Sequence, residues 1–285
     1  MYWYFIRHAE STNNATLNDD TTNDSSEFNN KRAPDPSLTE LGIKQATRTA
    51  EVLLSESSLV WITHDNNIRK LKLGMPKFNT IYCSPLRRSL ETAFLIQKKV
   101  NCKVIVLKDL CEVGGVFHGK RLYLPDMNDS IYCSGLSRSE ILKLYPDFEL
   151  EDKITEKGWW NQPQESIKCA LSRADKVIEW IWSISKNDLQ VHDKLTDSAS
   201  ILITHGLFQN ILMKKLLLGK GVEISPNEKL IFPCDNCGIS QLLFCPNTTE
   251  DNSKSDDNIV VCLKWNSTDH LDPKMRTTVN IIKRR

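Results

Sequence analysis

An arginine and a histidine stand side by side near the amino terminus, directly after five apolar residues. Residues 2–6 (Tyr-Trp-Tyr-Phe-Ile) are typical of a strand buried on both faces, and Arg7 and His8 follow at its carboxyl end. In open α/β sheets, ligands bind at that edge. An arginine offers a rigid fork of donors to phosphate or carboxylate, and a neutral imidazole offers a nucleophile or a base. By itself, the pair is equally compatible with a histidine that only closes a loop.

Three later segments supply groups of complementary chemistry. His205 follows a second apolar strand and precedes a glycine and a predicted helix. Arg87 and Arg88 lie on the first turn of another predicted helix, and Glu112 lies on a glycine-rich loop. Two imidazoles, two arginine positions and one acid suit a site that holds a phosphoryl group, accepts it covalently and protonates its leaving oxygen.

The order of these motifs resembles the histidine phosphatase superfamily, which has the phosphoglycerate-mutase-like fold. The segments that carry the resemblance are Arg7-His8, Leu38-Thr39-Glu40-Leu41-Gly42 with Gln45-Ala46, Ser84-Pro85-Leu86-Arg87-Arg88 with Thr92-Ala93, Glu112, and Thr204-His205-Gly206. Each is a weak signal, but all five in this order over most of the chain form a specific pattern. The family normally has glycine after the first histidine, where this chain has Ala9.

The resemblance implies an α/β fold, a three-layer sandwich with a mostly parallel central sheet and helices on both faces. The alternation of strand and helix patterns favours the same layered architecture. We expect a single domain over residues 1–285 with polar insertions near 12–36, 113–135, 187–198 and 246–258.

Periodicity and capping signals predict the individual elements. We expect helices near residues 37–54, 85–99, 138–145, 163–185 and 207–218, and strands near 2–6, 78–83, 103–107, 199–204, 229–232, 239–244 and 259–265. Ser37 and Glu40 fit a capping box at the start of the first helix. Residues 12–30 have almost no apolar side chains and predict a flexible loop. His64, in an ambiguous stretch, is interpreted as a surface or structural residue.

The resemblance also implies roles for two residues. His8 is expected to attack phosphorus and form a phosphohistidine, with its other ring nitrogen donating to a backbone carbonyl. Glu112 is expected to be the general acid, with a pKa raised by partial burial or by phosphate charge, and then to deprotonate the attacking water.

The remaining candidates would bind the phosphate or the rest of the substrate. Arg7, Arg88 and His205 are expected to contact the phosphate oxygens, while Gly206 allows close approach and the helix after it offers free N–H groups. Helical periodicity cannot choose between Arg88 and its neighbour Arg87, but the family motif selects Arg88.

Asn14 is a further candidate for substrate binding. It stands where related enzymes often have a substrate-contacting asparagine, although here it lies in an asparagine-rich tract.

Phosphatase and mutase share this machinery. Phosphoglycerate mutases follow the acid with Arg-His-Tyr-Gly-Gly, whereas residues 112–115 here are Glu-Val-Gly-Gly. The later arginine pair of the mutases is also missing. We therefore favour a phosphatase, with mutase-type phosphoryl transfer as the alternative and a non-catalytic phospho-ligand module as a remote third.

Two cofactor-dependent alternatives are weaker. Gly114 to Lys120 has the spacing of an ATP phosphate-binding loop, but Arg121 replaces the Ser or Thr that would bind Mg²⁺. Cys234 and Cys237 form one Cys-x-x-Cys pair without a second pair at zinc spacing. We expect no metal and no organic cofactor.

Composition limits the partners and the location. Thirty-seven basic residues against 36 acidic ones give a net charge of +1, which argues against charge-driven nucleic-acid binding. The nine cysteines suggest no disulfide framework, and no stretch approaches the ~20 apolar residues of a membrane span. We expect a cytoplasmic enzyme, without a secretory leader, that acts on a small phosphorylated metabolite or a phosphoprotein.

Overall fold

The computed structural model describes residues 1–18, 32–55, 59–64, 67–72, 76–117, 133–192, 198–219, 230–247 and 258–277. Within these ranges, only the backbone is described at 18, 59–64, 67–72, 190–192 and 218. The helices are α1 (Thr12–Asn18), α3 (Glu40–Leu53), α4 (Arg87–Val100), α5 (Arg138–Leu144), α6 (Ile167–His192) and α7 (Gly206–Leu218), with short 3₁₀ helices η1 (Lys108–Leu110) and η3 (Pro273–Met275). The strands are β1 (Tyr2–Arg7), β2 (Leu59–His64), β3 (Asn67–Lys72), β4 (Lys77–Cys83), β5 (Lys103–Val106), β6 (Phe148–Leu150), β7 (Ser198–Thr204), β8 (Ile239–Cys245) and β9 (Ile259–Ser267).

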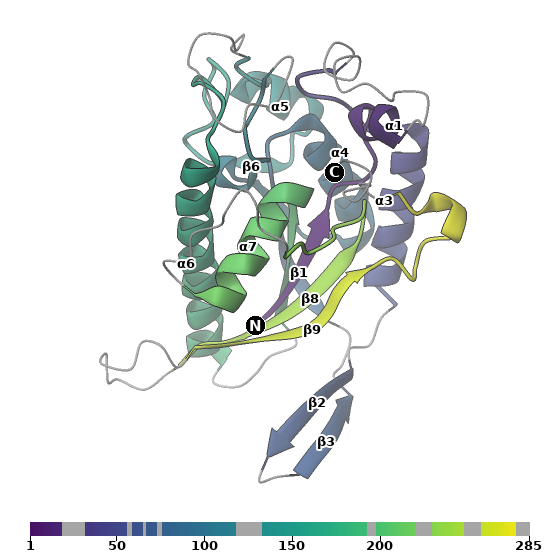
Figure 1. The fold of residues 1–285 in the computed structure, drawn as a ribbon, viewed down its shortest axis with the longest axis vertical. Helices are drawn as coiled ribbons and strands as arrows, with labels where there is room; N and C mark the ends of the chain where they lie inside the picture. Colours follow the sequence, from purple (N-terminus) through teal and green to yellow (C-terminus); the bar gives the residue numbers. More distant parts are fainter. Residues whose placement is uncertain are drawn as a thin grey trace.

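A seven-stranded sheet in the order β6-β5-β4-β7-β1-β8-β9 forms the middle layer (Figure 1). The strands from β6 to β1 are mutually parallel, and β8 runs antiparallel to both of its neighbours. Helices α3 and α4 pack together on one face, and α6 and α7 pack together on the other. The predicted α/β sandwich with a mostly parallel sheet is therefore confirmed.

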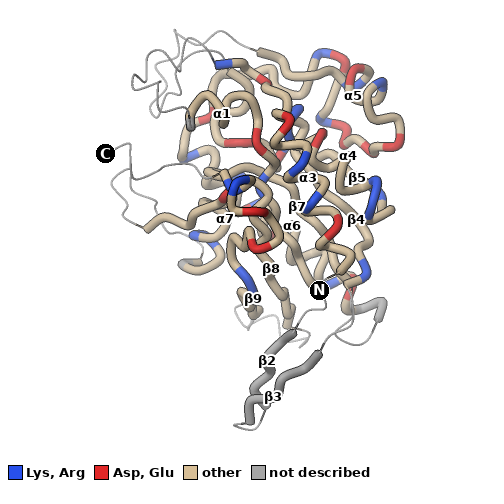
Figure 2. The backbone as a smooth tube through the Cα atoms, turned by 90° about the vertical axis from the view of Figure 1, so that its right-hand side faces the viewer, with Lys and Arg blue, Asp and Glu red and all other residues tan. Residues whose placement is uncertain are grey.

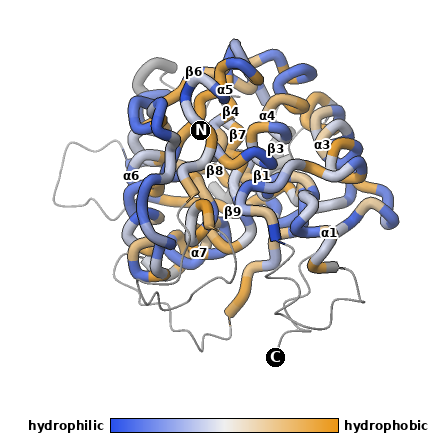
Figure 3. The backbone as a smooth tube through the Cα atoms, turned by 90° about the horizontal axis from the view of Figure 1, so that it is seen from above, coloured by the Kyte–Doolittle hydropathy of each residue, from blue (hydrophilic) through white to orange (hydrophobic). Residues whose placement is uncertain are grey.

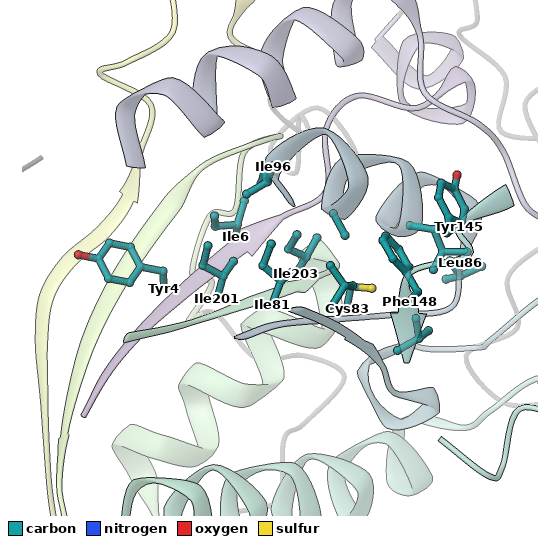
Figure 4. Close-up of a cluster of buried hydrophobic side chains, with 14 of the residues drawn as sticks. Tyr4, Ile6, Ile81, Cys83, Leu86, Ile96, Tyr145, Phe148, Ile201 and Ile203 are labelled. Carbon is teal, nitrogen blue, oxygen red and sulfur yellow. The ribbon is translucent and has the colours of Figure 1, made fainter. Parts of the chain in front are cut away.

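The central strands are buried on both faces, as their continuous apolar runs predict. In β1, Tyr4 and Ile6 belong to the core beneath α3 and α4, while Trp3 and Phe5 belong to the core beneath α6 and α7. This division follows from the two-residue period of a strand. Figure 4 shows Ile6 beside Ile201 and Ile203 of β7, and Figure 3 shows hydrophobic stretches on the strands and on the helices that cover them.

Three sequence predictions need correction. Residues 12–18 are helical rather than a loop, and Asn13 secures α1 through hydrogen bonds to the backbone of Ala33. The rest of that polar tract, residues 19–31, lies outside the described residues. Residues 187–192 continue α6 instead of forming a linker, since no proline or glycine interrupts the helix. Residues 230–232 are not a strand; the Asn210 side chain binds the Phe232 carbonyl and Pro233 follows.

Local signals also missed some elements and placed one cap wrongly. The β2–β3 hairpin and the three-residue β6 were not predicted. Thr39, rather than Ser37, caps α3, and its hydroxyl accepts from the Gly42 N–H at 3.0 Å. Gly42 itself is needed because an added Cβ would lie 2.1 Å from the Glu10 carbonyl oxygen.

Basic and acidic residues are interspersed along the described backbone (Figure 2). This arrangement agrees with the near-zero net charge. Of the helices that the structure describes, none is long and apolar enough to cross a membrane.

Candidate active site

The carboxyl ends of adjacent parallel strands bring the two predicted histidines together. Arg7 of β1 is in register with Thr204 of β7, so His8 and His205 leave neighbouring strands at the same level. The backbone bond from the His8 N–H to the Thr204 carbonyl, 3.0 Å, extends the ladder to this point. The ring centroids of His8 and His205 lie 5.0 Å apart. Two residues almost 200 positions apart thus share one site.

Hydrogen bonds define which nitrogen of His8 is available. The Nε of Arg88, on the first turn of α4, lies 3.1 Å from Nε2 of His8. An arginine Nε is always a donor, so Nε2 must be the acceptor. The proton of the neutral ring then sits on Nδ1, which donates to the Ala9 carbonyl at 2.7 Å. The expected bond to a backbone carbonyl is confirmed, and Nε2 carries the lone pair.

Both imidazoles are held in the neutral form. Burial lowers the pKa of His8 well below 6.5, and the positive charges of Arg88 and Arg7 lower it further. The pKa of His205 is also well below 6.5, first through burial and then through Arg88. Arg7, His8, Arg88 and His205 are only 0–8% exposed. A neutral histidine among cations has the charge state that a nucleophile requires.

Two buried nitrogens at this site have no hydrogen-bond partner within the described part of the chain. They are Nε of Arg7 and Nδ1 of His205. Arg7 uses Nη1 to bind the Cys234 carbonyl at 2.8 Å, and His205 uses Nε2 to contact the Ser84 hydroxyl at 2.8 Å. Gly206 lies beside this guanidinium, since an added Cβ would be 3.4 Å from Arg7 Nε. An anion with several acceptor oxygens would satisfy such groups.

Glu112 is held at the same edge by backbone N–H groups of its own loop and of α7. Its Oε1 accepts from the N–H groups of Val113 and Phe208 at 2.9 and 3.0 Å, and Oε2 accepts from Leu207 at 3.3 Å. The first turn of α7 therefore binds this carboxylate. We predicted that the N–H groups of this turn would be free for phosphate, but those of Leu207 and Phe208 are bound to Glu112. Burial lowers the pKa of Arg7, and the negative charge of Glu112 is among the smaller effects that raise it.

The structure separates the two neighbouring arginines. Arg88 is buried against His8, whereas Arg87 is half-buried. Asp35, which the sequence reasoning did not select, accepts from the Arg87 N–H at 2.8 Å and so caps the start of α4. Burial raises the pKa of Asp35 to about 6, and Arg88 opposes that rise. Asp35 thus helps to fix the helix turn that presents Arg88.

Asn14 does not point freely into the site. Its Oδ1 accepts from the N–H and hydroxyl of Ser11 and from Nδ2 of Asn236 at 3.2 Å. The same Asn236 nitrogen donates to the His8 carbonyl at 2.9 Å. Asn14 is therefore linked to His8 through Asn236, a residue that sequence reasoning missed as part of the site. The only available signal was its position within the Cys234–Cys237 motif.

The alanine after His8 packs in an apolar cluster. Ala9 is fully buried in an apolar cluster with Leu38, Ala46, Cys237 and Leu271. Its N–H donates to the Thr92 hydroxyl at 3.1 Å. With alanine at position 9 instead of glycine, His8 still makes its contacts with the backbone carbonyls of Ala9 and Thr204.

Neither cofactor alternative gains support from the described residues. Cys234 and Cys237 contact Arg7 through backbone atoms, and burial raises the pKa of each thiol to about 12. The described residues contain no group of three or more His, Cys, Asp or Glu side chains arranged for a metal ion. Gly114 and Gly115 are described, but Lys120 of the ATP-loop pattern lies outside the described residues.

We expect the free energy of unfolding to fall as the pH is lowered from 7 to 5.5. Because His8 and His205 have folded-state pKa values well below 6.5, the unfolded chain binds their protons first. Each histidine contributes stability that is fully present above its unfolded-state pKa and is lost as the pH falls below that value, at up to about 1.4 kcal/mol per pH unit. Asp35, with its raised pKa of about 6, has the opposite effect and offsets one histidine below that pH.

Urea unfolding of wild type and His205→Gln at pH 7.0, 6.5, 6.0 and 5.5 measures this dependence. The variant should lose the contribution of one proton, so its free energy should fall less steeply. Identical slopes in the two proteins would contradict the assignment of His205 as buried and neutral.

Comparisons with known proteins identify a matching family model and several structures with a similar fold. A model of the histidine phosphatase superfamily (branch 1) matches residues 70–123, which contain Arg88 and Glu112. No curated protein sequence matches the chain significantly. A mycobacterial hydrolase aligns over 94% of this chain and 93% of its own, with 18% identity and a TM-score of 0.52.

Two structures of mycobacterial glucosyl-3-phosphoglycerate phosphatase are also similar. The complex with VO3 covers 94% of this chain and 99% of its own, with 17% identity and a TM-score of 0.52. The complex with inorganic phosphate covers 95% and 99%, with 17% identity and a TM-score of 0.50. At these identities the likeness establishes the fold.

Proposed function

We propose that the chain is a histidine phosphatase, which hydrolyses a phosphomonoester through a phosphohistidine on His8. Support comes from the superfamily model that matches residues 70–123 and from the fold that the chain shares with the mycobacterial structures. The observation that carries the proposal is the state of His8. Its Nε2 is an unprotonated acceptor that faces Arg88, and the unpaired nitrogens of Arg7 and His205 belong to the same cluster.

In the first step, the lone pair of His8 Nε2 attacks phosphorus. The P–N bond forms while the P–O bond to the leaving group breaks, and the leaving oxygen takes a proton from Glu112. Arg88 gives up its hydrogen bond to Nε2 and, with Arg7 and His205, binds the phosphoryl oxygens. Preorganised donors of this kind stabilise charge that develops in the transition state.

In the second step, water attacks the phosphohistidine. The Glu112 carboxylate accepts a proton from the water, the P–N bond breaks, and its electron pair returns to Nε2. The products are inorganic phosphate and the neutral imidazole with which the cycle began. Dividing one difficult displacement into two easier ones is the gain from a covalent nucleophile.

We propose a small phosphorylated metabolite as the substrate, with a phosphoprotein as the less favoured possibility. Support comes from the similar mycobacterial structures, whose protein is described as a glucosyl-3-phosphoglycerate phosphatase. A phosphorylated sugar acid of that type is therefore a reasonable first probe. Arg7 and Arg88 supply the positive charge that the transferred group needs, so we propose that the reaction requires no metal ion.

Mutase-type transfer is the alternative, because it uses the same phosphohistidine. The near-complete burial of Arg7, His8, Arg88 and His205 would also suit an enzyme that excludes water. The chemistry differs in the acceptor, which is water in a phosphatase and a second hydroxyl in a mutase.

A product analysis tests the proposal. Wild type is incubated, with EDTA present, with p-nitrophenyl phosphate, glucosyl-3-phosphoglycerate and 3-phosphoglycerate. We expect release of inorganic phosphate from at least one of them. Isomerisation of 3-phosphoglycerate without phosphate release would favour the mutase, and tight phosphate binding with no turnover of any probe would favour the binding module.

A further inference from the structure

A buried ion pair between Arg173 and Glu165 joins α6 to the segment that precedes it. Neither residue is among those that we expect to contact phosphate. Arg173 donates from Nε and Nη2 to the two carboxylate oxygens of Glu165, at 2.8 and 2.5 Å. Their side chains are only 9% and 8% exposed. Replacing a buried pair of this kind by apolar residues is often neutral for stability. A contribution to stability alone therefore gives little reason for its presence.

The remaining donor of Arg173 binds the backbone that leads into Glu112. Its Nη1 donates to the carbonyls of Asp109 and Cys111, at 2.7 and 3.0 Å. The Cys111 carbonyl belongs to the peptide unit directly before Glu112. The Arg173 guanidinium thus binds Glu165 through Nε and Nη2, and it binds the backbone of residues 109–111, directly before Glu112, through Nη1.

The other partner of the pair holds the far side of the same loop. The Glu165 N–H donates to the Gly114 carbonyl at 3.4 Å, and the Gly115 N–H closes a turn onto the Glu112 carbonyl at 2.9 Å. Glu112 therefore lies between two backbone positions, one bound by each member of the ion pair.

Arg173 also contacts the residue that orients the Glu112 carboxylate. Its guanidinium carbon lies 3.9 Å from the centre of the Phe208 ring. The backbone N–H of Phe208 donates to Glu112 Oε1 at 3.0 Å. The backbone before Glu112 and the helix turn that binds its side chain are thus both set by contacts with Arg173.

We propose that Glu165 and Arg173 are positioning residues for Glu112, which hold its carboxyl group where it can protonate the leaving oxygen. This inference rests on the proposed function, in which Glu112 is the general acid. Neither residue contacts the reacting atoms in this account. Displacements of about 1 Å in a catalytic group can cost on the order of 10²-fold in rate, so a loosened loop should be visible in kinetics.

The test uses the dependence of rate on the leaving group. Departure of p-nitrophenolate needs little protonation, whereas an alkoxide needs a proton in the transition state. The ratio of kcat/KM for p-nitrophenyl phosphate to that for a simple alkyl phosphate therefore reports on the acid. A misfolded fraction lowers both rates equally and cancels in the ratio.

Arg173→Lys and Glu165→Gln are compared with Glu112→Gln and with a matched control. In Glu112→Gln we expect the ratio to rise by about 10²-fold or more, the range for losing a general acid. In Arg173→Lys and Glu165→Gln it should rise by about 10-fold or more. The control is Lys215→Met, which breaks the 3.0 Å pair between Lys215 of α7 and Asp175 of α6, and its ratio should stay at the wild-type value.

The outcomes separate the inference from the function on which it depends. If Glu112→Gln raises the ratio but Arg173→Lys and Glu165→Gln lower both rates equally, the pair is only structural and the inference is wrong. If Glu112→Gln itself leaves the ratio unchanged, the acid assignment fails and the inference fails with it. In the double variant Glu112→Gln/Arg173→Lys, we expect no further rise, because both changes act through one carboxyl group.

Discussion

Replacing His8 with alanine should reduce phosphomonoester hydrolysis by at least about 10⁴-fold, the scale on which enzymes lose activity without their nucleophile. Alanine removes Nε2, the atom that we propose forms the covalent bond and that lies 3.1 Å from Arg88 Nε. Water would then have to attack the substrate directly. The remaining donors could still bind phosphate, so binding should persist while turnover is lost.

Trapping the intermediate provides the decisive measurement. Wild type is mixed with a ³²P-labelled substrate and quenched, and the labelled protein is tested for a phosphoryl group stable in base and lost in acid. His64→Ala, on the β2–β3 hairpin, is the matched control and should behave as wild type. Labelling of His8→Ala, or its hydrolysis at the wild-type rate, would exclude His8 as the nucleophile.

Arg88→Met should have the second largest effect, a loss of about 10²–10³-fold in kcat/KM. This is the usual cost of removing one preorganised donor to a developing charge. Arg88 is also the first charge that depresses the pKa of His8, after burial. Its removal should therefore raise that pKa toward 6.5, and the acid limb of the activity profile should move to higher pH.

Arg87→Met is the natural control for this prediction. Arg87 directly precedes Arg88 in α4 and is half-buried. The hydrogen bond to His8 comes from the Arg88 side chain and not from that of Arg87. We expect only a small change in kcat/KM and an unshifted pH profile. A comparable loss in both variants would show that general charge at this helix turn matters, and not the particular donor at position 88.

Local sequence signals were sufficient for the elements that build the sheet. Apolar runs with a histidine at their end predicted β1 and β7, and apolar faces predicted α3 and α6, because burial on one or two faces imposes a period on the sequence. They were insufficient where polar groups, rather than apolar burial, hold the chain. Helix α1 depends on Asn13 and its contacts with Ala33, which lie 20 residues apart.

The sequence by itself determined the kinds of chemical group available and the strands that carry them: two imidazoles, arginines on a helix turn, and one acid. Only the tertiary structure decided how they meet. The parallel register of β1 with β7 brings His8 beside His205, and α4 turns Arg88, but not Arg87, onto Nε2 of His8. It also placed Arg173 against the Glu112 loop. The physical reason is that these contacts join residues 60 to almost 200 positions apart, and no local periodicity records which distant groups will be neighbours.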